Sequence, residues 1–148
     1  MKQKATALAL AKPKVADSEK ITINLGFVDL GQVDLLVAEG FYGNRSDFIR
    51  TAIRNQLGSH ADVVRQAAAR KMLVLGLQHF SADDLRAVKA TKQKLRIRVL
   101  GLATIADDVT PDLALATIDS LDVLGALHAS PAVKAALAPL NSHFRKST

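Results

Sequence analysis

Three polar residues at alternate positions carry the clearest chemical signal in this sequence: Lys20, Thr22 and Asn24. They are separated by three aliphatic residues, Ile21, Ile23 and Leu25. A period of two is typical of a strand with one apolar and one polar face. The polar side offers a cation for guanine or phosphate, a hydroxyl with a methyl group, and an amide able to bond adenine through two hydrogen bonds. The chemistry these residues suit is hydrogen bonding to base edges in the major groove of DNA.

A second polar group, Gly43, Asn44, Arg45, Ser46 and Asp47, precedes an apolar run. Asn44 is a favourable helix N-cap, and Asp47 three residues later gives a capping-box-like arrangement. Free amides and the positive end of the helix dipole favour an anion there, where Arg45 and Ser46 suit a phosphate and Gly43 permits close approach. The alternative interpretation is a well-capped helix on a solvated surface.

The elements around these residues are one strand and two amphipathic helices. Helical spacing links Leu30, Val33, Leu36 and Val37, and again Phe48, Ile49, Ala52, Ile53 and Leu57. A lone strand has no hydrogen-bonding partner, and the cheapest source of one is a second copy of the chain. Antiparallel pairing would make a two-stranded ribbon that fits the major groove. We expect the dimer core to contain Ile21, Ile23, Leu25, Phe48, Ile49 and Ile53.

Residues 18–58, with the ITINL strand and the GNRSDFIRTAI helix start, resemble the ribbon-helix-helix DNA-binding proteins of the CopG, Arc and MetJ type. The resemblance implies that Lys20, Thr22 and Asn24 read bases and that Gly43, Asn44, Arg45 and Ser46 hold the phosphate backbone. It departs at Gly26, where many members have proline after the strand, and this loosens the entry to the first helix.

Composition narrows the range of functions. The formal net charge of +6 and the pI near 9.8 suit a polyanionic partner. The chain has no cysteine, and its four histidines lie at spacings that predict no metal site. No phosphate-binding glycine loop or nucleophile elbow is present, so we expect neither an enzyme nor a cofactor. Without an apolar run of membrane-spanning length or a secretory signal, the sequence predicts a cytoplasmic, nucleoid-associated protein.

The second half of the chain contains a repeat, since Val-Leu-Gly occurs at Val74, Val99 and Val123. Each copy precedes a helix-start signal: Ser81 with Asp84, Thr110 before Pro111, and Ser130 before Pro131. A strand, turn and helix repeated about every 24 residues is typical of a β/α solenoid with short parallel strands. Two alternatives remain open for it. It joins dimers into a higher oligomer, or it only stabilises the chain or binds a small effector.

The sequence therefore predicts an α+β protein in five segments. These are a basic arm at 1–18, the ribbon-helix-helix domain at 19–58, a helical linker at 59–70, the repeat domain at 71–140 and a tail at 141–148. Lys12 and Lys14 in the arm, and Arg96 and Arg98 in the repeat domain, are candidates for extra DNA contacts; solubility and a solvated face are the alternatives.

The expected function is a sequence-specific transcriptional regulator, a repressor, that binds double-stranded DNA as a homodimer or higher oligomer. The rivals are the antitoxin of a toxin-antitoxin pair, which would bind a protein partner, and a DNA-organising or plasmid-partition protein that coats DNA.

Overall fold

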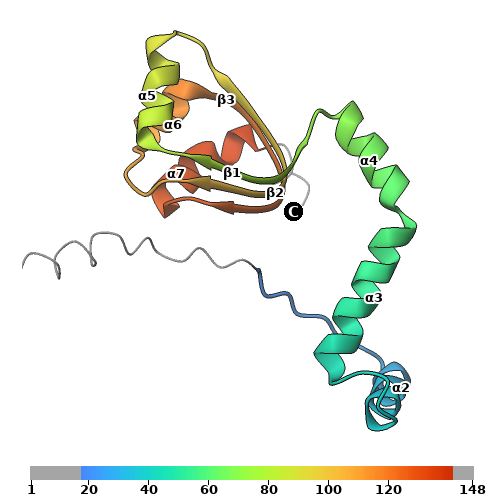
Figure 1. Cartoon of the computed structure of the whole chain (residues 1–148). Helices are drawn as coiled ribbons and strands as arrows, with labels where there is room; N and C mark the ends of the chain where they lie inside the picture. Colours follow the sequence, from blue (N-terminus) through green and yellow to red (C-terminus); the bar gives the residue numbers. More distant parts are fainter. Residues whose placement is uncertain (1–17, 142–148) are drawn as a thin grey trace, which may run out of the picture.

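A computed structural model describes residues 18–141 (Figure 1). The predicted basic arm, including Lys12 and Lys14, and the tail beyond Asn141 lie outside the described residues. Figure 1 shows a run of helices, α2, α3 and α4, followed by a separate unit of strands and helices. No helix among the described residues is long and apolar enough to cross a membrane.

The helical run consists of α2 (Phe27–Ala38), α3 (Arg45–Ser59) and α4 (Ala61–Arg70). The sequence placed the end of the ribbon-helix-helix domain at Gly58, but α3 continues through this residue and breaks at His60, whose φ is −107° and ψ is 13°. Glycine in a helix costs only about 1 kcal/mol relative to alanine, so a single glycine does not end a helix unless its backbone turns left-handed. Helix α4 then continues in the stretch where the linker was expected.

The predicted strand at Lys20–Leu25 has neither helix nor strand structure in the single chain. Figure 1 shows it as an open trace that leads into α2. A strand is defined by its hydrogen-bonding partner, and no partner segment lies within residues 18–141. The antiparallel ribbon thus stays a prediction about two chains.

The second unit is a three-stranded parallel sheet with consecutive order, made of β1 (Val74–Phe80), β2 (Leu95–Ile105) and β3 (Ile118–His128). The three Val-Leu-Gly copies pair in register: Val74 with Val99 and Val99 with Val123, and the two following positions likewise. The expected short strands are longer than the repeated tripeptide, since β2 and β3 each have 11 residues. The repeat therefore predicted parallel strands correctly and their lengths wrongly, and the solenoid itself stays a prediction.

Helices α5 (Ala82–Ala90), α6 (Pro111–Thr117) and α7 (Pro131–Leu137) lie on the same face of this sheet, and the short helix η1 (Ala138–Leu140) follows (Figure 1). Leu85, Val133 and Leu137 from the helices are buried in one cluster with Val99 and Leu121 from the strands. Burial of aliphatic side chains at roughly 25 cal/mol per Å² of apolar surface is the main stabilising term for such a unit.

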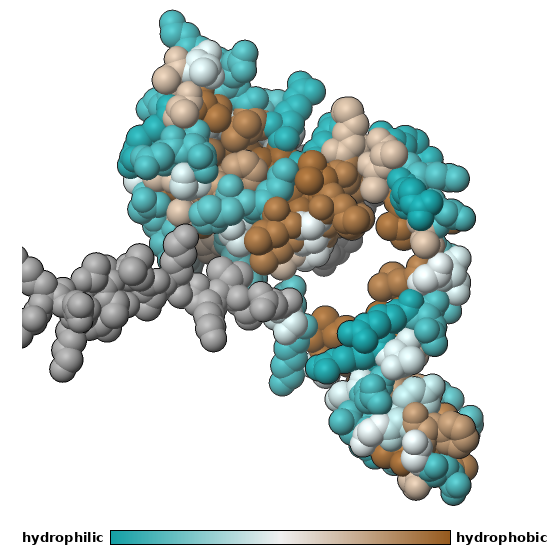
Figure 2. Space-filling model, in the orientation of Figure 1, coloured by the Kyte–Doolittle hydropathy of each residue, from teal (hydrophilic) through white to brown (hydrophobic). Residues whose placement is uncertain are grey.

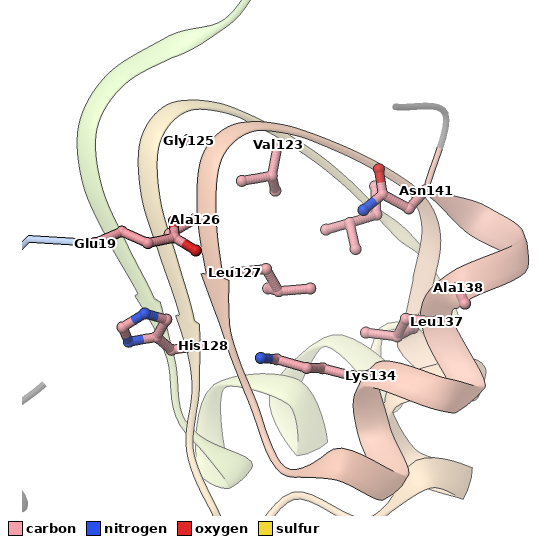
Figure 3. A pocket seen from close by; sticks show the side chains of 11 residues that line it. Glu19, Val123, Gly125, Ala126, Leu127, His128, Lys134, Leu137, Ala138 and Asn141 are labelled. Atoms are coloured by element: carbon pink, nitrogen blue, oxygen red, sulfur yellow. The ribbon is translucent and has the colours of Figure 1, made fainter. Parts of the chain in front are cut away.

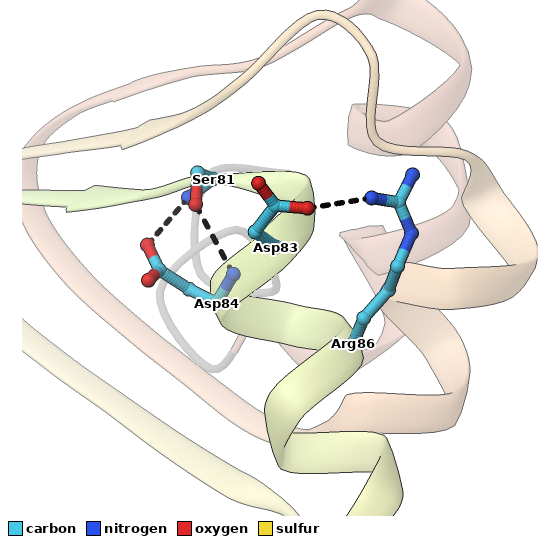
Figure 4. A network of polar contacts seen from close by, with 4 residues as sticks. All are labelled: Ser81, Asp83, Asp84 and Arg86. Carbon is cyan, nitrogen blue, oxygen red and sulfur yellow. Dashed lines mark hydrogen bonds and ion pairs between the residues drawn. The ribbon is translucent and has the colours of Figure 1, made fainter.

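All three predicted helix starts of this unit are confirmed. Ser81 caps α5 in a full capping box: its hydroxyl accepts from the Asp84 amide at 3.1 Å, and the Asp84 carboxylate accepts from the Ser81 amide at 2.9 Å (Figure 4). These hydrogen bonds lower the pKa of Asp84, the bond from the Ser81 backbone contributing most. The hydroxyls of Thr110 and Ser130 accept hydrogen bonds from the amides of Leu113 and Val133 and so cap α6 and α7.

A row of glycines crosses the sheet at the third position of the repeat. Gly76, Gly101 and Gly125 have φ values of 119°, 141° and 120°, a region that side-chain-bearing residues rarely adopt. A Cβ on Gly101 would lie 2.3 Å from the Gly76 carbonyl oxygen, and one on Gly125 would lie 2.1 Å from that of Gly101. Glycine is therefore required at positions 101 and 125, because the preceding strand lies against each of them.

Candidate nucleic-acid interface

The start of α3 presents two backbone amides to solvent. The side chain of Asn44 accepts a hydrogen bond from the Asp47 amide at 2.8 Å, as its N-cap position predicted. The Asp47 carboxylate accepts from the Gly43 amide at 3.0 Å, where a full capping box would use the Asn44 amide. Within the described chain, no acceptor engages the amides of Arg45 and Ser46. Together with the helix dipole, these two donors can bind an anion such as phosphate.

Arg45 forms an ion pair with a residue that the sequence did not indicate. Its Nε and Nη2 atoms donate to the two carboxylate oxygens of Asp34 in α2, at 2.6 and 2.7 Å. These hydrogen bonds lower the pKa of Asp34, and the same pairing raises the pKa of Arg45. Both side chains are about half exposed, so Asp34 holds the guanidinium at the surface.

The predicted base-reading residues, Lys20, Thr22 and Asn24, are all exposed. No hydrogen bond or ion pair within the described chain joins them to the start of α3. The two predicted parts of the interface are thus present in one chain but are not brought together by contacts within it.

The predicted dimer core is largely uncovered in the single chain. Ile21, Ile23 and Leu25 are 72%, 55% and 42% exposed, and Ile53 is exposed as well. Phe48 and Ile49 are partly buried, and the Phe48 ring meets Tyr42 edge-on with centroids 5.0 Å apart. From Ser18 to Arg70 the structure has one buried side chain, that of Val33. Exposed aliphatic side chains concentrated in one segment and its neighbouring helices are typical of a site of protein association.

Arg96 and Arg98, the candidates for extra DNA contacts, lie on β2 and already have partners. Arg96 forms an exposed ion pair with Asp119 at 3.4 Å, and Arg98 donates to the Lys71 carbonyl at 3.1 Å. Exposed pairs contribute about 0–1 kcal/mol, so these contacts do not prevent either guanidinium from meeting a phosphate.

Two of the histidines, His79 and His128, belong to strands of the sheet. His79 lies in β1, and His128 is the last residue of β3. A ring nitrogen of His79 lies 2.6 Å from the Thr104 hydroxyl, and Thr104 pairs with His128 on the next strand. Among the described residues, no group of three or more His, Cys, Asp or Glu side chains could hold a metal ion.

Sequence reasoning missed Asp34 as the partner of Arg45. The two residues belong to different helices, and their separation of 11 matches no spacing within one helix. The only available signal was a carboxylate on the polar side of α2, which a solvated surface explains equally well.

A family model described as the Ribbon-Helix-Helix transcriptional regulator family matches residues 16–134, which include the helical run and most of the parallel-sheet unit. Searches of curated proteins and of solved structures found no match.

Proposed function

Because the chain belongs to the ribbon-helix-helix transcriptional regulator family, we propose that it is a sequence-specific repressor that binds double-stranded DNA as a homodimer. In this proposal the Lys20–Leu25 segments of two chains pair as an antiparallel ribbon. Lys20, Thr22 and Asn24 from both chains enter the major groove and read base edges.

The observation that carries this proposal is the exposed apolar side of the Lys20–Leu25 segment. The side chains of Ile21, Ile23 and Leu25 have no cover in the single chain, and α2 and α3 beside them contain only one buried residue, Val33. A segment and two helices of this size cannot bury enough surface to be stable alone. Pairing two copies places the aliphatic residues against the helices and turns the three polar side chains outward.

The start of α3 would fix the position of the dimer on DNA. The free amides of Arg45 and Ser46, the N-cap at Asn44 and the close approach that Gly43 allows supply a phosphate site on each chain. Arg45 would contact the same phosphate while Asp34 holds its guanidinium in place. Phosphate contacts of this kind set orientation and leave sequence discrimination to the ribbon.

Residues 71–140 would join such dimers into a higher oligomer that spans several operator half-sites. Support comes from the sheet, whose three strands are near the minimum number of repeats for stability and whose β1 edge has no strand beside it within residues 18–141. The buried cluster of this unit also argues against an antitoxin whose tail wraps a toxin, because such a tail lacks a core of its own. We place the protein in the cytoplasm, associated with the nucleoid.

The test is selection of binding sites from a random pool of DNA duplexes, with a Lys20→Ala, Thr22→Ala, Asn24→Ala triple variant beside the wild type. We expect the wild type to enrich a short motif repeated at fixed spacing, and the variant to lose it. Wild type and variant that bind all duplexes equally, with a steep dependence on salt, would instead favour a DNA-coating protein.

A matched single substitution sharpens this test. Asn24→Ala should cost about 1–3 kcal/mol on the selected site and relax preference at one base position, since a bidentate base contact is lost. Equal losses on the selected site and on random DNA would contradict base reading by Asn24.

A further inference from the structure

Gly76 has the backbone of a residue that accepts a neighbouring strand, yet within residues 18–141 no strand lies on its outer side. Its φ of 119° matches the values of 141° and 120° at Gly101 and Gly125. A side chain at either of those two glycines would overlap the carbonyl of the preceding strand, whereas one at Gly76 would meet nothing within 4 Å. Within residues 18–141, β1 is the terminal strand of the sheet and its outer edge is unpaired. The free edge of β1 thus has the conformation that β2 and β3 use to dock against the strand before them.

The other end of the sheet has a groove beside it. A hollow of about 440 Å³ runs along the outer side of β3, next to α7 and η1 (Figure 3). Its walls include Val123, Gly125 and Leu127 from β3 and Leu137 from α7, while Lys134 and Glu19 also reach it. At one end, Asn141 forms a single parallel bridge to Leu121. The groove follows the edge along which a fourth strand of the repeat would lie.

We propose that β1 of a second copy occupies this groove and pairs in parallel with β3, so that one sheet continues from chain to chain. In this register Gly76 of one copy lies beside Gly125 of the other. The proposal deepens the oligomer of the proposed function by naming its interface, and it does not depend on DNA.

The register of the existing strands supports this pairing. β1 pairs with β2 only from Val74 onward, opposite Val99, and Ile97 has no partner on β1. Ile97 in turn pairs with Leu121 on β3. An incoming β1 that repeats the β1–β2 register would therefore begin opposite Val123 and leave Leu121 free for the bridge to Asn141. At Leu121 the bridge to Asn141 does not overlap the proposed strand, and residues 142–148 lie outside the described residues.

The side chains near the free edge are chemically suited to such an interface. Leu75 and Leu77 are 78% and 66% exposed, and Met72 and Val74 are exposed beside them. Figure 2 shows apolar side chains gathered over the end of the sheet where β1 begins. The proposed register puts Leu75 beside Leu124 and Leu77 beside Ala126 of the second copy, which extends rows of aliphatic side chains already present across the strands. An exposed aliphatic edge strand is otherwise a site of uncontrolled association.

This contact is head to tail, because it joins two different edges. Each added copy leaves one β1 edge and one β3 groove free, so the assembly grows until it closes into a ring or continues as a filament. Dimers joined through their ribbons would be linked by it into larger assemblies.

Cysteine cross-linking tests the register directly, because the native chain has no cysteine. In a Leu77→Cys, Ala126→Cys variant of the full chain, the two thiols of one molecule lie on β1 and β3 with β2 between them. Two strand spacings of about 4.8 Å put their Cα atoms roughly 9–10 Å apart, beyond disulfide reach. Between copies the proposed register makes them direct neighbours. We expect mild oxidation without DNA to give a ladder of covalent dimers, trimers and larger species on a denaturing, non-reducing gel.

Two further cysteine variants serve as controls. The Leu75→Cys, Ala126→Cys variant is out of register by two residues and should give at most a tenth of the ladder. The Leu77→Cys variant alone should give no ladder; efficient dimers from it would mean that two β1 edges pair antiparallel about a twofold axis, and would overturn the proposal. A ladder that appears only after the chain is truncated at Asn141 would also overturn it, because the residues beyond Asn141 would then be the groove's own occupant.

Sedimentation of the unmodified protein gives an independent measurement. We expect species larger than a dimer that grow with concentration, and a Leu77→Lys variant that stays dimeric, since a charged edge residue blocks strand addition. A wild type that remains dimeric at every concentration would refute the proposed interface, while loss of sequence-selective DNA binding with the ladder intact would refute only the proposed function.

Discussion

Arg45 at the start of α3 and Asp34 in α2 form a two-bond ion pair, with distances of 2.6 and 2.7 Å, that links the two helices of the proposed DNA-binding unit. A guanidinium that donates two parallel hydrogen bonds to a carboxylate is restricted in orientation. The pair therefore fixes the orientation of an exposed guanidinium on the first residue of α3.

Arg45→Ala should weaken binding to all DNA sequences by a similar factor and lower the salt slope of binding by about one, because one phosphate contact is lost. Asp34→Asn is the matched variant: it weakens the hold on the guanidinium but keeps the cation, and should weaken binding to all sequences by less than Arg45→Ala does. Titration of labelled duplexes at several salt concentrations measures both effects. An Asp34→Asn variant that binds as weakly as Arg45→Ala would show that Arg45 acts only when the carboxylate holds it.

Ile23→Asp should abolish the dimer, since it puts a charge on the apolar side of the proposed ribbon. We expect sedimentation at micromolar concentration to show loss of the ribbon dimer, and circular dichroism to show loss of helix from α2 and α3. Thr22→Ala changes the opposite side of the same segment and should leave the dimer intact. If Ile23→Asp keeps the wild-type dissociation constant, the ribbon is not the dimer interface.

Gly101→Ala should destabilise the sheet much more than Gly76→Ala. Both substitutions place a side chain on a left-handed backbone, at a cost of about 1–3 kcal/mol. Only the Cβ at Gly101 also overlaps a carbonyl of the same chain, at 2.3 Å, which adds about 1–3 kcal/mol. Urea unfolding, at a concentration where the wild type is no larger than a dimer, measures the difference. Equal losses of stability in the two variants would mean that backbone conformation alone, and not contact with the preceding strand, requires glycine at these positions.

Asp84→Ala should lower stability at neutral pH, and its deficit should vanish in acid. The hydrogen bonds from Ser81 lower the pKa of Asp84 in the folded chain. The carboxylate therefore contributes stability above the unfolded pKa of about 3.9, and this contribution is lost as pH falls through the lower folded value. Urea unfolding between about pH 5 and pH 2 checks this. Asp83→Ala, which removes only the exposed pair with Arg86, should show a much smaller pH-dependent deficit.

Local features of this protein could be predicted from sequence because they depend on residues a few positions apart. Asn44, Ser81, Thr110 and Ser130 cap the helices that follow them, as their types predicted. The Val-Leu-Gly repeat predicted three strands, because strands at equivalent points of a repeat face equivalent neighbours. The family resemblance of the first third was likewise visible in the residues and agrees with the family match.

Other features depend on contacts between distant residues, and these only the tertiary structure decided. The bond between Arg45 and Asp34 requires a particular packing of two helices. The need for glycine at Gly101 and Gly125 follows from the carbonyl of the strand before each, and the free edge at Gly76 follows from the absence of such a strand within the described chain. Sequence alone set the helix caps and the strand repeat, since both arise from short-range preferences. The tertiary structure decided which polar groups pair and which strand edges remain unpaired, because both depend on how separate elements pack.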